Sequence, residues 1–364
     1  MSEQSRYRPL WLSLPVVGFI MSEWQVWRKE QMQPCYRLTS ISREGSELPP
    51  YALDMEPLLA LPFGTLDEFG VPYNAPINKS PAAYQPTTIT QYGLANWNAY
   101  LMTGDEKYRE AFMIQAHWLV EHALPLVDDA AGWPIPFASP HYSTPKLWLS
   151  ALTQGNAISV LVRAYWLTKE DVFLRVARRA ICTFERDIRD GGVSTSIGEN
   201  GVFFEEVAVY PATHILNGYL LALFGLYDYV SLSNEPQIAV LIQRSLATLH
   251  ALLDRYDMGY WSYYDLLSKR PATLFYHALH VTLLEALAQY SGCEHCAALA
   301  AHWAGYQRSL RCKVRYFLAS RIVRYRRGLQ RLFISTPTTE MNNSQTSLIV
   351  HNSMQSAKMS SNDV

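Results

Sequence analysis

The sequence shows no excess of either charge. Its 364 residues hold 31 Lys and Arg against 32 Asp and Glu, a formal net charge of −1. Nucleic-acid-binding domains carry a basic surplus, and disordered chains combine high net charge with few apolar residues. Here hydrophobic residues make up 49% of the chain and charged residues 17%. We therefore expect a folded protein with a large core and no nucleic-acid partner.

Cysteines and long apolar runs are also scarce. Five cysteines in a chain of this length do not indicate a disulfide framework, and we expect a reducing, cytoplasmic compartment. Cys293-Glu294-His295-Cys296 has the spacing of a metal-binding pair but lacks a second pair, so we predict a helix start and no metal. No run reaches the ~18–20 apolar residues that span a bilayer. Residues 10–21 imitate a signal peptide, but a buried N-terminal element is the favoured interpretation.

The chain repeats itself from residue 88 onward. Gly93, Gly155, Gly218 and His277 each lie near the start of an apolar stretch, at intervals of 62, 63 and 59 residues. A second, amphipathic stretch follows each of them, over residues 106–122, 171–187, 236–254 and 294–309. Such helical hairpins are typical of a curved or closed array of paired helices. We predict a mainly α fold, an (α/α)4 toroid whose first helices are buried because they are apolar on most faces.

The remaining parts of the chain differ from this repeat. Residues 1–87, rich in proline, should form loops and short strands packed on the toroid, which spans 88–312. From 308 to 331 there are nine basic residues and no acidic one, interleaved with apolar side chains. This pattern predicts a basic amphipathic helix over 313–335, and we expect the polar tail, 336–364, to be disordered.

The basic segment, residues 308–331, suggests a partner. A basic helix with an apolar face suits an anionic membrane surface or an acidic polysaccharide. We expect peripheral contact with the inner membrane surface, and a solvated closing helix is the alternative.

Aromatic residues, 13% of the chain, gather before the predicted first helices. In a toroid the segments that enter these helices lie at one end, so residues 70–86, 132–137, 203–211 and 260–265 should converge. Because Tyr and Trp offer an apolar face beside a polar tip, rings such as Trp133 favour a sugar-binding cleft at this end. Aromatic residues that merely cap the helical barrel are the alternative.

Titratable residues in these segments are the catalytic candidates. Glu205 and Glu206 form an acidic pair among apolar neighbours, and burial would raise a carboxyl pKa until the group acts as a base near neutrality. Either could instead cap a helix or pair with an arginine such as Arg163. Tyr276 and His277 begin the first helix of the fourth hairpin, and His280 lies one turn further. Packing of these side chains in the core is an equally good interpretation. The sequence holds no nucleophile elbow, P-loop, zinc-protease or dinucleotide motif.

Several motifs occur together in the order found in one family. Residues 148–165 closely resemble the signature helix of the D-glucuronyl C5-epimerase C-terminal domain. The same order holds in the following segments: Gln91-Tyr92-Gly93-Leu94 upstream, then Phe204-Glu205-Glu206, Leu216-Asn217-Gly218-Tyr219, Tyr264-Asp265-Leu266 and Tyr276-His277. The resemblance covers roughly residues 70–310.

The resemblance implies epimerisation of D-glucuronate to L-iduronate in a polysaccharide or its precursor, with no cofactor. By the same resemblance, Glu206 and Tyr276 match the family's two proton carriers, which flank the sugar at C5, and Tyr264 matches another tyrosine tied to activity. Arg163 would clamp the substrate carboxylate or serve the structure, since a planar guanidinium suits a uronate. Further substrate contacts are expected from Glu205, Tyr210, Trp133, Asn217, His277, His280 and Tyr92.

Two departures from the family pattern bear on the substrate. Val207-Ala208 follows the acidic pair where the animal enzymes have Tyr-Pro, and Tyr210-Pro211 is the nearest equivalent. Leu267 stands where they carry a basic residue. Two other functions stay open: a polysaccharide lyase, which shares proton abstraction at C5, and a non-catalytic glycan-binding or assembly protein. The animal relatives dimerise, and we expect a homodimer on that ground.

Overall fold

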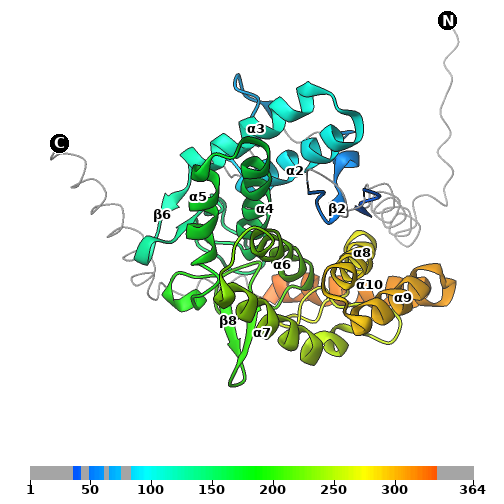
Figure 1. Cartoon of the computed structure of the whole chain (residues 1–364). Helices are drawn as coiled ribbons and strands as arrows, with labels where there is room; N and C mark the ends of the chain where they lie inside the picture. Colours follow the sequence, from blue (N-terminus) through cyan, green and yellow to red (C-terminus); the bar gives the residue numbers. More distant parts are fainter. Residues whose placement is uncertain (1–35, 42–48, 61–64, 75–82, 334–364) are drawn as a thin grey trace, which may run out of the picture.

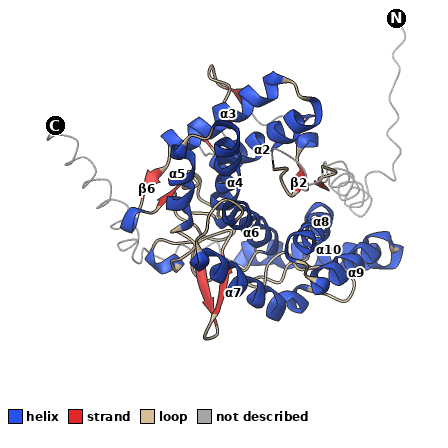
Figure 2. Ribbon diagram, in the orientation of Figure 1, coloured by secondary structure: helices blue, strands red, loops and turns tan. Residues whose placement is uncertain are grey.

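The computed structural model describes residues 36–41, 49–60, 65–74 and 83–333, with side chains described up to residue 321. Helices dominate it, and the few strands are short (Figure 2). The helices that follow residue 85 are α2 (Pro86–Thr103), α3 (Glu106–Glu121), α4 (Ala151–Thr168), α5 (Asp171–Ile181), α6 (Leu216–Val230), α7 (Pro236–Leu252), α8 (Leu274–Ser291), α9 (Glu294–Arg308) and α10 (Leu310–Phe333).

Local sequence signals set the helix ends. Pro86 occupies the first turn of α2, where its missing N–H costs nothing. The side chains of Ser150 and Thr273 accept a hydrogen bond from a backbone N–H in the first turn of α4 and α8. Gly104 and Gly292 end α2 and α8 with positive φ angles of 68° and 69°, which glycine adopts without strain.

The helices form four consecutive hairpins, as the repeat predicts. The first helices α2, α4, α6 and α8 pack side by side in chain order, and α3, α5, α7 and α9 pack on their outer side (Figure 1). Nearly all of α4 and α6 is buried, whereas the outer helices alternate buried and exposed residues. The prediction of a mainly α, (α/α)4 toroid is therefore confirmed.

Glycines let the two central helices approach closely. A Cβ atom added at Gly155 of α4 would lie 2.6 Å from the Cα of Ala222 on α6, and one added at Gly225 would overlap the backbone of Gly155. Small residues at such a crossing bring two backbones together, and larger ones would push them apart. This close crossing fixes the relative positions of the helix starts, from which the site described below is built.

Of the described residues before α2, 36–41 and 49–60 lie between the first and last hairpins, whereas 65–74 lie against α3 (Figure 1). The carbonyl of Pro49 accepts a hydrogen bond from the indole of Trp97 on α2, and the hydroxyl of Thr282 on α8 donates to the carbonyl of Tyr36. Short antiparallel strands occur in this part (Figure 2): β1 (Arg37–Leu38) with β2 (Leu53–Asp54), and β3 (Thr65–Leu66) with β4 (Pro72–Asn74) and β5 (Ala83–Tyr84). A 3-10 helix spans Glu56–Ala60.

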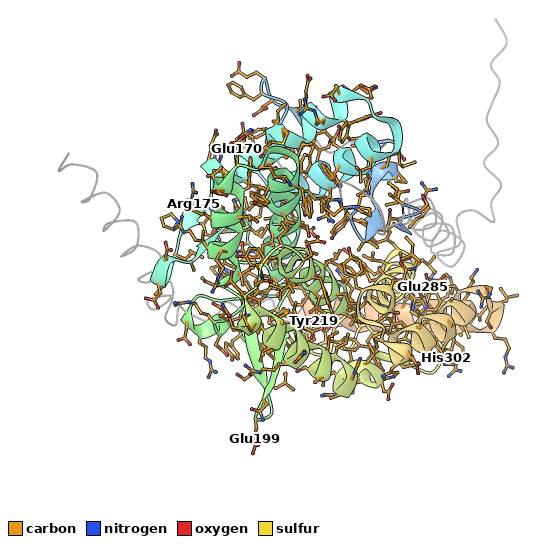
Figure 3. The ribbon with its side chains drawn as sticks, in the orientation of Figure 1. Glu170, Arg175, Glu199, Tyr219, Glu285 and His302 are labelled. Atoms are coloured by element: carbon orange, nitrogen blue, oxygen red, sulfur yellow. A yellow bond between two sulfur atoms is a disulfide. The ribbon has the colours of Figure 1, made fainter. Side chains whose placement is uncertain are left out.

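Two further strand pairs join the helices. The hairpin β6 (Leu124–Pro125) and β7 (Ala131–Gly132) follows α3, and the hairpin β8 (Ser194–Ile197) and β9 (Gly201–Phe204) precedes α6. The second hairpin packs on α7 and carries Glu199 at its tip, pointing away from the molecule (Figure 3).

The last helix in the described part of the chain is α10, which packs on α9. Among the described residues, no helix combines the length and the hydrophobicity needed to cross a bilayer. The apolar segment 10–21 and the tail 336–364, for which the sequence predicts a buried element and disorder, lie outside the described residues.

Candidate active site

Two of the segments predicted to converge, 203–211 and 260–265, meet at the starts of the buried helices, where the residues just before α4 join them. The amide of Ala151, the first residue of α4, donates to the carbonyl of Glu205 at 3.0 Å. The amide of Leu216, which begins α6, donates to the carbonyl of Tyr264 at 3.3 Å. Tyr142, in the segment before α4, donates from its hydroxyl to Asp265 at 3.4 Å. These contacts link the segments before α4, α6 and α8 into one cluster.

Glu206 lies at the centre of this cluster. Its Oε2 accepts a hydrogen bond from the side-chain amide of Asn217 at 2.9 Å, and its Oε1 accepts one from the hydroxyl of Tyr264 at 3.3 Å. Gly218 leaves room for it, because a Cβ atom there would overlap Cβ and Oε2 of Glu206. Burial raises the pKa of Glu206 from 4.5 to about 7, against the opposing hydrogen bonds and the nearby Arg270 charge. The group is therefore balanced between acid and base near neutrality.

Tyr264 and Tyr276 bring two phenols to the same place. Their rings meet edge to face with centroids 4.7 Å apart, and a side-chain hydrogen bond joins the two residues. Burial and the neighbouring Glu206 carboxylate raise the pKa of both hydroxyls above the usual value of 10. Both phenols are therefore protonated at neutral pH and can donate a proton.

Arg270 adds a positive charge that sequence reasoning missed. Its guanidinium lies 3.9 Å from the ring centroid of Tyr264, donates to Asp265 at 3.2 Å, and donates to the hydroxyl of Tyr142 at 3.0 Å. The side chain remains 27% exposed, so it can reach a ligand. A signal was present in the sequence, because Arg270 lies three residues after Leu267, where the family pattern places a basic residue.

This arrangement suits proton transfer beside a carboxylate. Glu206, with its raised pKa, can take a proton at neutral pH, and the two tyrosines can return one. Arg270 can form a bidentate contact with a substrate carboxylate and stabilise charge that develops on it. Side chains of Glu206, Tyr276, Tyr142 and Arg270 all keep part of their surface exposed, so a ligand can contact them.

Glu205, predicted as a substrate contact, takes a structural position instead. It is fully buried and accepts hydrogen bonds from the hydroxyl of Thr195 at 2.8 Å and from the backbone amides of Thr213 and His214 at 3.2 and 2.9 Å. Its carboxylate therefore holds β8 and the segment after Glu206 together. The adjacent carboxylates are separated because successive side chains in extended backbone point to opposite sides.

Arg163 and Trp133, also predicted as substrate contacts, lie in the interior. Arg163 has no exposed surface and forms an ion pair of 2.6 Å with Asp228, which is also buried. It joins α4 to α6 and donates to the carbonyl of Pro50 at 2.7 Å, which matches the structural alternative for this residue. The indole of Trp133 is 1% exposed and donates to the carbonyl of Leu119 on α3.

The two predicted histidines are buried as well. Nδ1 of His277 and Nδ1 of His280 lie 2.7 and 3.0 Å from the hydroxyl of Ser262. The ring of His277 also stacks on Trp261, with centroids 3.8 Å apart. Burial lowers the pKa of His277 from 6.5 to about 4, so the ring is neutral at neutral pH. Helix α8 places both rings in the core, and no described contact joins either of them to Glu206.

Tyr210 and Tyr92 are not brought to Glu206 by any described contact. Tyr210 is 54% exposed, and the guanidinium of Arg189 lies 5.5 Å from its ring centroid. Tyr92 lies in the first half of α2, half-buried. Of the predicted site residues, the structure thus brings together Glu206, Tyr264, Tyr276 and Asn217.

A family model and a curated relative relate the chain to D-glucuronyl C5-epimerase. Residues 127–305 match the family model described as the C-terminus of D-glucuronyl C5-epimerase. The chain is 33% identical over 230 residues to the D-glucuronyl C5-epimerase of Caenorhabditis elegans, a match that covers 57% of this chain and 36% of that protein. An uncharacterized protein of Methanocaldococcus jannaschii is 30% identical over 151 residues, 41% of this chain and 49% of its own. The chain thus spans less than half the length of these curated relatives.

Solved structures resemble the chain more loosely. An unsaturated glucuronyl hydrolase from Bacillus sp. GL1 matches with a TM-score of 0.41 and 16% identity, over 62% of this chain and 64% of that one. A polysaccharide lyase matches with a TM-score of 0.41 and 13% identity, over 62% and 59%. Similarity at this level assigns no activity.

Proposed function

Residues 127–305 form a domain of the D-glucuronyl C5-epimerase C-terminal family, and from this premise we propose that the protein is a uronate C5-epimerase. It would convert D-glucuronate to L-iduronate residues within a polysaccharide or its precursor. The observation that carries the proposal is the cluster itself: a carboxyl with a pKa of about 7 contacts a pair of hydrogen-bonded tyrosines beside an arginine.

The first step removes the proton at C5 of the uronate. The Glu206 carboxylate accepts it, and the C–H electron pair moves towards the sugar carboxylate, which becomes an enediolate. A base whose pKa lies near the working pH is best suited to this transfer, since it is both available and strong enough. Arg270 faces the developing negative charge from the same cluster, so it stabilises the intermediate more than the substrate.

The second step returns a proton to the opposite face of C5. The Tyr276 hydroxyl donates it, which forms the new C–H bond and leaves a phenolate. Tyr264 contacts both carriers, through its hydrogen bond to Glu206 and its contact with Tyr276. A proton can therefore pass from protonated Glu206 through Tyr264 to the phenolate, and both carriers regain their starting states without a cofactor.

Solvent isotope exchange tests the proposal. The chain is incubated in deuterated water with glucuronate-containing polysaccharides, and deuterium at C5 is measured by NMR or mass spectrometry. We expect exchange with the parent protein and none with Glu206→Gln, whereas Tyr276→Phe should form no iduronate. Two variants serve as matched controls: Glu199→Gln, at the exposed tip of the β8–β9 hairpin (Figure 3), and Tyr108→Phe, on the outer helix α3.

The outcomes separate the competing functions. Exchange that is equal in parent and Glu206→Gln would refute the role of the carboxylate. Ultraviolet-absorbing unsaturated product, formed when the C4 substituent leaves, would identify a lyase. Binding of a polyuronate without exchange, unaffected by Tyr276→Phe, would identify a glycan-binding protein.

We also propose that α10 contacts an anionic membrane surface. Tyr316 is buried and stacks on Trp261 with ring centroids 4.8 Å apart, so one side of the helix is anchored to the toroid. The opposite side exposes Leu310, Val314 and Leu318, spaced four residues apart on one helical face. The absence of acidic residues from 308 to 331 makes this helix complementary to anionic lipid.

Vesicle sedimentation tests this partner. The full chain should sediment with phosphatidylserine-containing vesicles, less so as salt rises, and not with phosphatidylcholine alone. The double variant Val314→Asp and Leu318→Asp should lose binding, whereas Val240→Asp, at an exposed apolar residue of α7, should keep it. Equal binding of the double variant, or binding to a soluble polyuronate but to no vesicle, would refute a membrane partner.

A further inference from the structure

A second cluster of reactive side chains lies far from Glu206 in the sequence, between the outer helices α7 and α9. Cys293 caps the N-terminus of α9, and its Sγ accepts a hydrogen bond from the amide of Cys296 at 3.0 Å. The two cysteines form a disulfide with Cα atoms 5.3 Å apart. The reaction proposed at Glu206 uses neither cysteine.

The neighbouring helix supplies a third donor. His250, in the last turn of α7, places its Nε2 3.0 Å from Sγ of Cys293. The donor atoms of His250, Cys293 and Cys296 all lie within 4.8 Å of one another, and in the described part of the chain no other three His, Cys or acidic groups come so close. The sequence showed the metal-like spacing of the two cysteines but predicted no metal, because the third donor is more than forty residues away.

The donor set has a clear chemical preference. Two sulfurs and one imidazole suit a soft or borderline divalent ion, and zinc binds such sets at about 2.3 Å from sulfur and 2.0 Å from nitrogen. His250 is exposed, which gives an ion a route to the buried sulfurs.

We propose that Cys293, Cys296 and His250 form a zinc site when the disulfide is reduced, and that the disulfide is the metal-free state of the same site. Three protein ligands leave the fourth position to a water or small ligand. Bound zinc joins α7 to α9 and so links the third hairpin to the fourth. Redox conditions then decide whether the two hairpins are linked by metal.

The conversion balances with an external reductant. A phosphine or a dithiol donates two electrons, the S–S bond breaks, and two protons from water complete two thiols. Zinc then displaces those protons as the two sulfurs bind as thiolates. Reoxidation by a small-molecule disulfide, which accepts two electrons and two protons and leaves as two thiols, restores the S–S bond and releases the ion.

Zinc titration of the full, tag-free chain tests the proposal. The chain is reduced with a phosphine under anaerobic conditions, and zinc is titrated in competition with a chromophoric chelator. We expect one zinc per reduced chain and none on the oxidised chain. Cobalt(II) in place of zinc should give a thiolate charge-transfer band and tetrahedral absorption, and both should disappear on oxidation.

Variants identify the ligands. Cys293→Ser, Cys296→Ser and His250→Ala should each weaken zinc binding at least tenfold. Cys182→Ser and Cys312→Ser, at the two described cysteines outside the disulfide, should bind as the parent does. Zinc binding that is absent from the reduced parent, equal in the oxidised parent, or unchanged in His250→Ala would overturn the proposal. The comparison of reduced with oxidised parent needs no variant, so it holds even where a substitution impairs folding.

Discussion

Replacing Glu206 by Gln tests the electrostatics of the site, because it removes the charge and keeps the size of the side chain. Burial raises the pKa of Glu206 from 4.5 to about 7. Since one pH unit corresponds to about 1.4 kcal/mol, ionisation of Glu206 costs the folded protein about 3 kcal/mol relative to the unfolded chain. We therefore expect Glu206→Gln to be inactive and yet more stable than the parent at alkaline pH.

The sign of the pH dependence follows from the raised pKa. The folded protein holds the Glu206 proton more tightly than the unfolded chain does. This contribution to stability is fully present below about pH 4.5, the unfolded pKa, and is lost as the pH rises through about 7. A glutamine is neutral throughout, so the stability advantage of the variant should be small near pH 4.5 and approach about 3 kcal/mol above pH 8.

The surroundings can accommodate the new amide. Asn217 donates its amide to Glu206, and its own Oδ1 is buried with no hydrogen-bond partner among the described residues. If the Asn217 amide turns over, this oxygen can accept from the Gln amide. Tyr264 can still donate to the remaining oxygen, so the contact between these two side chains is kept in the variant.

Urea unfolding at about pH 4.5 and at about pH 8.5 measures the effect. Glu205→Leu is a control with the opposite sign, because it removes the acceptor of the Thr213 and His214 amides, at about 1–3 kcal/mol for each donor left without an acceptor. If Glu206→Gln were less stable than the parent at the higher pH, or if its advantage were the same at both, the reasoning would be refuted.

Three further substitutions test other contacts. Gly218→Ala should displace Glu206 and lower C5 exchange while leaving the fold intact by circular dichroism; full activity would contradict the close approach. Asp228→Asn should destabilise the protein by about 3–5 kcal/mol in urea unfolding, because Arg163 keeps its buried charge without a counter-ion, and parent-like stability would disprove this. Arg270→Gln should raise the KM for uronate and move the acidic limb of the pH–rate profile to higher pH, because Arg270 lowers the pKa of Glu206; an unshifted profile would argue against that role.

The helices could be predicted from sequence because their signals are local. Pro86, Ser150 and Thr273 act within one turn of the residues they cap, and the apolar stretches repeat at nearly constant intervals. The predicted second helices agree with α3, α7 and α9 to within about two residues, and α5 ends earlier than predicted, at Ile181. There the chain leaves the helix to enter β8.

The candidate site could be predicted only in part. Glu206, Tyr264 and Tyr276 were identified through motifs, and the structure brings them into contact. Arg270 was missed because its importance depends on the path of the segment between Leu267 and α8. Arg163 was assigned two alternatives, and only the ion pair with Asp228 distinguishes them.

The sequence by itself determined the helical hairpins, their order, and the family motifs, since periodicity and short motifs depend on neighbouring residues. Only the tertiary structure decided which polar residues face the site and which face the core. Glu205 and Glu206 are adjacent in the chain, yet one holds backbone amides in the interior and the other meets two tyrosines. The same holds for His250 and Cys293, whose contact joins two helices. Such contacts depend on helix packing and burial, which one-dimensional patterns do not specify.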